Sequence, residues 1–370
     1  MAFLLLHLER TTGINKFNSN NQQSVINMRV YFKNIEIYLM MIILCGMMLS
    51  CSTSPDSSKI DINITKIWDK VPHKAFTDLI KFNGTYYCSY SEECSSSGDT
   101  PDTMGSIRII RSKTGKKWES VDLIQKNGMK LCNPRLSITP DRQIMIIMDG
   151  SVSSLVSFSD KKGNVFSEPE SVNIDTTIVI GKKRLWKVTW FRGTGYALFY
   201  KSDSKNDKLN LLKTIDGKNF EKITKIEVDG ILNESTLRFD QKGTMYAIIS
   251  REDGDKKGTL GMSRWPYKEW RYRKINDSPD IFNFTIVNKS IVMVAPGLSK
   301  PELYTGIMAV HKNGYIKEIV KLPLGKDPCY PGILTESGSL LVSCYSAHEG
   351  KPAIYLVKIP IKFIKQKMKE

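Results

Sequence analysis

A motif of two short apolar strands separated by a small turn returns six times along the chain. Its copies open at residues 75–78, 133–136, 186–189, 233–236, 282–285 and 330–333. The openings lie roughly 45 to 60 residues apart, a period typical of propeller blades, each of which is a small antiparallel sheet. No long amphipathic helix interrupts the pattern. The sequence therefore predicts an all-β chain folded as a six-bladed β-propeller.

Residues 1–50 have the character of a leader. The apolar run 37–49 follows Arg29 and Lys33 and ends just before Ser50 and Cys51. Because a bilayer span needs roughly 20 apolar residues, this run favours a cleaved secretory signal. A small residue followed by cysteine resembles a bacterial lipobox, which makes Cys51 the predicted lipidation site; an ordinary signal peptide cut nearby is the alternative. Met28 is an alternative start of translation.

The remaining chain divides into a lipidated Ser-rich tether at 51–59, the propeller at 60–362 and a basic tail at 363–370. The first strand, near residues 60–68, is expected to complete the last blade and remove free sheet edges. We expect the tail to be too short for a long helix. The predicted location is the bacterial cell envelope, at the outer membrane or periplasmic face, with the lipid as the membrane contact and the protein as a monomer.

The formal net charge is +16. A net positive charge attracts polyanions. The lysines of this chain, however, are spread over turns, as in the pairs Lys116–Lys117 and Lys161–Lys162. This distribution argues against a nucleic-acid partner and favours weak attraction to acidic glycans or anionic lipid.

Cysteine and histidine usage excludes two further classes. Beyond Cys51, the cysteines at 88, 94, 132, 329 and 344 lack CxxC spacing, so neither a disulfide framework nor a zinc site is predicted. Pairing of Cys88 with Cys94 is one alternative, and buried strand cysteines are the favoured state. No metal or organic cofactor is expected.

Two turns, 112–118 and 214–220, share a spacing, and 159–166 is a looser copy. Each opens with a hydroxyl, carries a central glycine and ends on an aromatic, a combination in which side-chain oxygens accept backbone N–H groups and glycine takes the left-handed corner. These turns resemble the Asp-boxes of the sialidase superfamily, and the resemblance extends over nearly the whole chain after Cys51.

The resemblance implies a set of catalytic residues. Glu234, at the start of a strand, and Arg251, at the end of the next, match a base and a substrate-binding arginine, and Tyr330 matches the nucleophile. A phenol with a pKa near 10 needs an adjacent base to attack at neutral pH, which is the role of Glu234. The general acid is either Asp99 or Asp102.

The chain departs from the family at the arginines that hold the substrate carboxylate. Only Arg251 is matched, so Lys74, Lys187 or Arg135 is a candidate for the missing charge. Asp78 and Asp327 also stand at strand ends, where propellers place their ligand face, although either could cap a turn. Likewise, Glu234 could form a structural pair with Arg251 or Arg238.

The predicted function is an exo-type glycoside hydrolase, a sialidase or related glycosidase, acting on glycans. The alternative is a glycan-binding propeller that keeps the scaffold without the chemistry. The missing arginines favour the second hypothesis, and the pair formed by Glu234 and Tyr330 favours the first.

Overall fold

The structure is a computed structural model that describes residues 62–71, 76–92, 105–151, 153–174, 183–201, 209–251, 257–275, 283–296, 304–325 and 331–370. The chain separates into two compact units, Met1–Ile60 and Asp61–Glu370, and all of these residues belong to the second. The predicted leader, Cys51 and the tether lie outside the described residues.

The second unit consists of six blades, whose strands pair antiparallel except for β10 and β15 of blade 3. Blade 1 contains β2 (Thr77–Phe82), β3 (Thr85–Glu92), β4 (Ser106–Ser112) and β5 (Glu119–Ile124). Blade 2 contains β6 (Cys132–Ile138), β7 (Ile144–Asp149), β8 (Ser154–Phe158) and β9 (Glu170–Ser171). Blade 3 contains β10 (Asn173–Ile174), β11 (Lys183–Leu185), β12 (Thr189–Phe191), β13 (Thr194–Lys201), β14 (Leu209–Thr214) and β15 (Asn219–Ile226).

The remaining blades keep the four-stranded pattern. Blade 4 contains β16 (Leu232–Phe239), β17 (Met245–Arg251), β18 (Thr259–Ser263) and β19 (Trp270–Lys274), and blade 5 contains β20 (Asn283–Val287), β21 (Ser290–Pro296), β22 (Thr305–Val310) and β23 (Ile316–Lys321). Blade 6 contains β24 (Gly332–Glu336), β25 (Ser339–Ser346), β26 (Ala353–Pro360) and the first strand, β1 (Asn63–Trp68).

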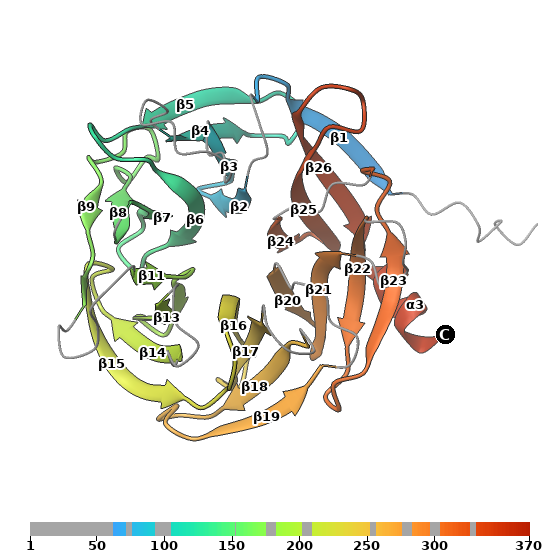
Figure 1. The fold of residues 1–370 in the computed structure, drawn as a ribbon. Helices are drawn as coiled ribbons and strands as arrows, with labels where there is room; N and C mark the ends of the chain where they lie inside the picture. Colours follow the sequence, from blue (N-terminus) through green and yellow to red (C-terminus); the bar gives the residue numbers. More distant parts are fainter. Residues whose placement is uncertain are drawn as a thin grey trace, which may run out of the picture. The chain divides into compact units, whose positions relative to one another are not determined.

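The pairing of β1 with β26 closes the ring. The two strands run antiparallel, with Asn63 opposite Lys358, so the start of the propeller completes its last sheet. Neighbouring blades meet through their innermost strands, among them β2 with β6 and with β24, and β16 with β20 (Figure 1). The six-bladed β-propeller predicted from the repeat is confirmed, as is closure by the first strand.

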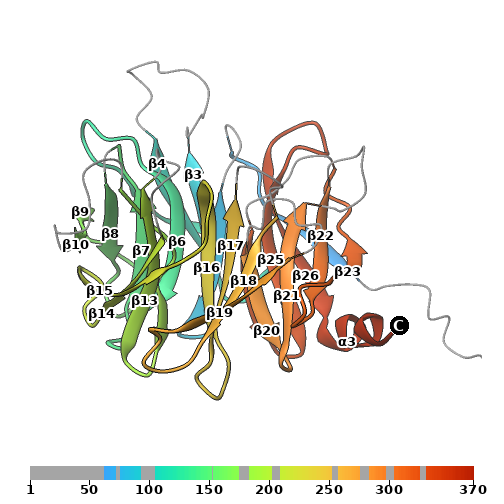
Figure 2. The same cartoon turned by 60° about the horizontal axis from the view of Figure 1, so that its bottom comes forward.

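The blades give the propeller two different ends (Figure 2). All the innermost strands begin at one end, which we call the entry end, and their first hairpin turns lie at the other, which we call the turn end. The entry end brings together the openings of the six sequence repeats. It is therefore the end at which residues far apart in the chain can form one site.

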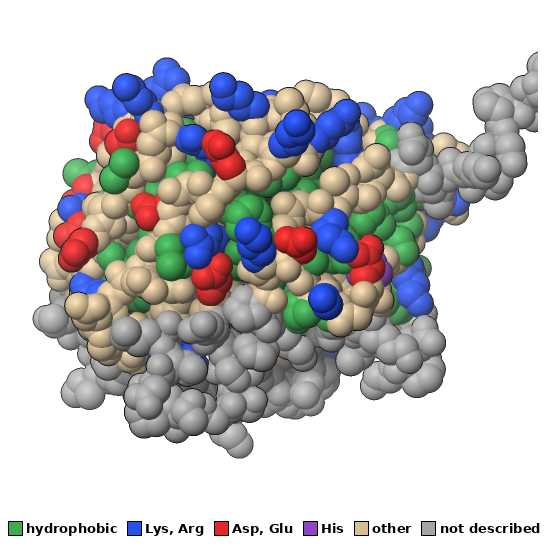
Figure 3. Space-filling view, turned by 90° about the horizontal axis from the view of Figure 1, so that it is seen from above, with side chains coloured by type: hydrophobic (Ala, Val, Ile, Leu, Met, Phe, Trp, Pro, Cys, Tyr) green, Lys and Arg blue, Asp and Glu red, His purple; other side chains and the backbone are tan. Residues whose placement is uncertain are grey.

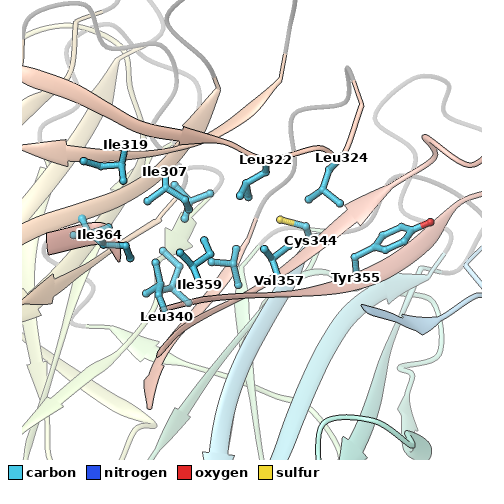
Figure 4. Close-up of a cluster of buried hydrophobic side chains, with 14 of the residues drawn as sticks. Ile307, Ile319, Leu322, Leu324, Leu340, Cys344, Tyr355, Val357, Ile359 and Ile364 are labelled. Carbon is cyan, nitrogen blue, oxygen red and sulfur yellow. The ribbon is translucent and has the colours of Figure 1, made fainter. Parts of the chain in front are cut away.

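A hydrophobic cluster joins blades 5 and 6 to a C-terminal helix, α3 (Ile361–Lys369) (Figure 4). Ile364 of the helix is fully buried in this cluster, while its lysines are exposed or partly exposed. The tail thus forms a short helix of nine residues, in keeping with the expectation that it is too short for a long one. Packing of Ile364, together with Ile361, Phe363 and Met368, against the cluster stabilises a helix whose length alone is marginal.

Cysteine pairing also differs from the prediction. Cys132 and Cys344 each take part in a disulfide bond, while Cys88 is free and buried on β3. The Cys88–Cys94 alternative is therefore wrong.

The repeated turns have the predicted local chemistry. Gly115, Gly163 and Gly217 all have φ between 75° and 77°. The Thr214 hydroxyl accepts the N–H of Gly217 at 2.8 Å, and one carboxylate oxygen of Asp216 accepts the N–H groups of Lys218 and Asn219, both at 2.8 Å. These contacts satisfy the turn internally, which leaves the intervening side chains at the surface.

Basic side chains are frequent at the turn end. The lysine pairs 116–117 and 161–162 are exposed on turns there, and Lys and Arg side chains line the upper edge in Figure 3. Among the described residues, no helix is both long and apolar enough to span a bilayer.

Replacing Ile364 with alanine tests the role of α3. We expect the free energy of unfolding to fall by about 2–5 kcal/mol, since a fully buried aliphatic side chain is removed from a packed cluster. Urea denaturation measures the effect, with the exposed Lys365→Ala as the matched control. Equal midpoints for the two variants would show that the helix contributes nothing to the core.

A pH titration tests the Asp216 turn. Burial opposes the shift, but hydrogen bonds from Asn219, Lys218 and Thr214 lower the pKa of Asp216 to about 2. The folded pKa thus lies below the unfolded value of about 3.9, so the stabilisation is present above pH 4 and lost as the pH falls toward 2. At pH 6 the free energy of unfolding should be larger for wild type than for Asp216→Asn, although solvent screening reduces the difference. The difference should shrink as the pH falls toward 2. A difference independent of pH would contradict this account.

Candidate functional site

A small cavity of about 40 Å³ lies at the entry end, where all six blades meet. Its lining is mostly polar and aromatic: Phe76, Thr77, Asp78, Asn133, Pro134, Arg135, Trp186, Lys187, Thr236, Asn283 and Pro331. We call this the central cavity. A volume of this size holds one or two water molecules, so it forms the floor of a site and not a complete sugar pocket.

The backbone is irregular around the cavity. The register of β6 with β7 shifts between Cys132 and Arg135, and that of β16 with β17 shifts between Leu232 and Ser235. Between these two blades, the inner strand of blade 3 is interrupted after Leu185 and resumes as β12. Such bulges turn side chains away from the regular alternation. They occur here at the repeat openings, where a site requires special side-chain directions.

The carboxylate of Asp78 ties three blades together. Asp78 is 2% exposed. One oxygen accepts the N–H of Leu79 at 2.9 Å, the other accepts the N–H of Leu136 at 2.7 Å, and both accept Lys187 Nζ, at 2.9 and 2.7 Å. Asp78, Leu136 and Lys187 belong to blades 1, 2 and 3. This arrangement gives Asp78 a structural role at the axis.

Lys187 lies in the gap between β11 and β12, and its ammonium group donates to both carboxylate oxygens of Asp78. Burial lowers the pKa of Lys187, the Asp78 carboxylate raises it, and the positive charges of Arg238 and Arg135 lower it further. The ammonium therefore needs Asp78 as its partner. Lys187 is less suited to clamp a substrate carboxylate than the sequence suggested.

Arg238 and Asn283 extend the site across blades 4 and 5. One guanidinium nitrogen of Arg238 donates to the carbonyl of Leu237 at 2.6 Å and another to Asn283 Oδ1 at 2.7 Å. Asn283 Nδ2 in turn donates to the carbonyl of Pro331 at 3.0 Å. Burial lowers the pKa of Arg238 to about 10, against the opposing effect of Asp78, so the side chain remains charged at neutral pH. Sequence reasoning considered Arg238 only as a structural partner for Glu234.

Arg135 is the basic group with unused hydrogen-bonding capacity. Its side chain is 7% exposed. The guanidinium carbon Cζ lies over the Trp186 ring, 3.3 Å from the ring centroid. Nη1 donates to the carbonyl of Asn133 at 2.9 Å and to Asp149 at 3.3 Å. Nη2 is buried and has no hydrogen-bond partner among the described residues. A buried guanidinium N–H without an acceptor is costly, which indicates a place for an acceptor supplied by a ligand.

The charges around the cavity do not cancel. Asp149 also accepts Arg184 Nη1, at 3.1 Å. Among the described side chains, the carboxylates Asp78 and Asp149 thus face Arg135, Arg184, Lys187 and Arg238, which leaves an excess of positive charge. A buried site of this sign favours an anionic ligand.

The structure places the predicted residues as follows. Asp78, Lys187 and Arg135 meet at the central cavity. Arg251, half-buried at the end of β17, is paired with Leu232, so it lies at the same end of blade 4 as the bulge whose backbone includes Glu234. Asp99, Asp102, Asp327 and Tyr330 lie outside the described residues, and Tyr330 directly precedes the cavity residue Pro331.

Fold and cavity together define a six-bladed propeller with a basic site on its axis. A scan against protein-family models and a search of curated proteins find no match. Solved structures do match. A protein of unknown function from Dyadobacter fermentans is 16% identical, covering 80% of this chain and 99% of that chain, with a TM-score of 0.66.

Two characterised glycosidases share the fold. A Trypanosoma rangeli sialidase mutant with trans-sialidase activity is 12% identical over 82% of this chain and 60% of that chain, with a TM-score of 0.62. An α-L-arabinofuranosidase from Fusarium graminearum is 15% identical over 82% of this chain and 98% of that chain, with a TM-score of 0.61. At such identities the similarity establishes the fold and leaves the activity to be argued from the site.

Removing the Asp78 carboxylate tests its structural role. We expect Asp78→Asn to lower the unfolding free energy by about 3–5 kcal/mol, because Lys187 is left buried without its counter-charge. The double variant Asp78→Asn/Lys187→Met should lose less, since it buries no unpaired charge. Urea denaturation of both single variants and the double variant gives the coupling energy. Additive losses would show that the two groups do not act as a pair.

Proposed function

We propose that this protein is an exo-acting glycoside hydrolase whose central cavity recognises an acidic sugar. The unpartnered Nη2 of Arg135 carries the proposal, because a sugar carboxylate is the acceptor that a guanidinium binds best. The positive excess around Arg135 adds to this preference. Structural neighbours that include a sialidase and an arabinofuranosidase support a glycan as the ligand.

The proposed chemistry uses residues matched by the family resemblance. Tyr330 attacks the anomeric carbon while Glu234 accepts its phenolic proton, and either Asp99 or Asp102 protonates the leaving oxygen. Water then releases the sugar from the tyrosyl intermediate, with the same carboxylic acid now acting as base. Arg251 and Arg135 hold the substrate, while Asp78 and Lys187 position the blades. The positions of the repeat openings support this assignment, since the chain enters β24 immediately after Tyr330.

We further propose that the protein is a monomeric lipoprotein of the bacterial envelope, anchored through Cys51. The disulfide bonds of Cys132 and Cys344 support a location outside the cytoplasm, because disulfides persist in oxidising compartments. The local geometry of the repeated turns supports kinship with Asp-box propellers.

A glycan-binding protein without catalysis is the second candidate. The observation that favours it is the use of Lys187 by Asp78, which leaves the site without a full set of free cations around the substrate carboxylate. Binding would then depend on Arg135, and Tyr330 would serve as a contact surface.

Sugar release by the purified protein tests the proposal. We expect release from glycans that end in a carboxylate-bearing sugar and a loss of at least about a thousandfold in Tyr330→Phe, since the nucleophile is removed while binding is kept. Binding without release by wild type would establish the second candidate instead. Arg273→Gln, an exposed residue of β19, is the control and should behave as wild type.

The carboxylate preference has its own test. Arg135→Gln should weaken binding of the acidic sugar by about 10- to 100-fold, the loss of a charged hydrogen bond, and leave binding of the carboxyl-reduced sugar unchanged. The ratio of the two affinities separates recognition from instability of the variant. An unchanged ratio would rule out Arg135 as the carboxylate contact.

A further inference from the structure

An open groove of about 1330 Å³ lies at the turn end of blades 4 and 5, opposite the central cavity. It is bordered by the turns 240–244 between β16 and β17, 264–269 between β18 and β19, and 288–289 between β20 and β21, together with Lys312. We call it the basal groove. Because these turns are at the far ends of strands that begin at the cavity, the groove is separate from the site already described.

The basal groove has a large positive excess. Its basic side chains are Lys242, Arg264, Lys268, Arg271, Lys289 and Lys312, and its acidic ones are Asp240 and Glu269. Within the described part of the chain, none of the six basic groups forms an ion pair.

Asp240 is occupied by its own turn. One of its oxygens accepts the N–H groups of Lys242 and Thr244, at 2.9 and 2.8 Å, and the other accepts the Tyr246 hydroxyl at 3.4 Å. Asp240 therefore serves the hairpin and does not pair with the neighbouring cations. The groove keeps its positive charge available for a partner.

The groove also offers aromatic faces. Trp265 is 80% exposed, which is unusual for so large an apolar side chain. Beside it, Trp270 is stacked on Tyr272 with the rings 9° from parallel, and its indole N–H donates to the carbonyl of Tyr267 at 3.2 Å. One indole is thus held in place while the other is free to cover a ligand. An aromatic face with basic groups around it suits a ring that is apolar on one side and anionic at its edge.

We propose that the basal groove is a second carbohydrate site, which binds an anionic oligosaccharide. Trp265 covers a sugar ring, and the basic side chains bind the carboxylate or sulfate groups along the chain. Single-stranded nucleic acid would also be attracted by the charge, but its binding sites stack successive bases on several aromatic faces. Here one exposed indole is present in the described groove, which suits one sugar ring and not a run of stacked bases.

The site works independently of the central cavity. A polymeric acidic glycan held at the turn end keeps further chains near the protein, while the entry end takes a terminal sugar. The proposal does not depend on catalysis, because the residues that line the groove and those that line the central cavity are two separate sets.

Titration with a heparin-derived octasaccharide, at several salt concentrations, tests the proposal on the full-length protein. We expect Trp265→Ala and the pair Arg264→Gln/Lys268→Gln each to weaken binding by at least about tenfold, as for central contacts of an interface. The charge pair should also reduce the salt dependence. Trp265→Phe should restore most of the affinity, which separates loss of the aromatic face from loss of fold.

Two controls decide between a site and general attraction. Lys161→Gln/Lys162→Gln and Lys116→Gln/Lys117→Gln each remove the same charge from another turn of the same end; both should bind the octasaccharide as wild type does. Absence of binding by wild type, or equal losses in the Lys161–Lys162 pair, would overturn the proposal. Tighter binding of a single-stranded oligonucleotide, or of anionic phospholipid vesicles, that depends on Trp265 would overturn it in favour of that ligand.

Discussion

The buried carboxylate of Asp78 is the interaction on which the axis of this propeller depends. In a ring of separate sheets, the relative positions of the innermost strands are set mainly by side chains that reach from one sheet to the next. Asp78 crosses from blade 1 to the backbone of Leu136 in blade 2 and to the ammonium of Lys187 in blade 3. Close backbone approach adds to this, since a Cβ at Gly332 of blade 6 would clash with Leu79. The floor of the site is consequently built from contacts that also join the blades.

This dual use explains the electrostatics of the cavity. Lys187 is neutralised where it stands, and Arg238 is held by the uncharged oxygens of Leu237 and Asn283. Arg135 pairs with Asp149 and packs on Trp186, and it retains one buried N–H with no acceptor in the part of the chain that the structure describes. The residues that hold the structure together therefore leave one directed donor and a net positive charge, which is the combination that selects a carboxylate.

The two ends of the propeller differ in how they present charge. At the entry end, basic groups are buried and directed by hydrogen bonds, so few ligand shapes fit. At the turn end, the basic groups of the basal groove are exposed around Trp265 and form no ion pair with any described residue, so they suit a longer, more variable polyanion. The turn carboxylates do not compensate this charge, because Asp216 and Asp240 are used by backbone N–H groups of their own turns.

The sequence by itself determined the repeat, the blade count, the closure by the first strand and the chemistry of the turns, because each depends on residues close in the chain or on the period itself. It also singled out Asp78, Arg135 and Lys187 as neighbours of the repeat openings. Only the tertiary structure decided what these residues do: Asp78 and Lys187 are 109 positions apart and meet only when the ring closes. For the same reason the fourth basic group Arg238, the helix stabilised by Ile364 and the basal groove could not be read from local patterns. Local sequence specifies a blade, whereas the pairing of charges at the axis is set by the arrangement of all six.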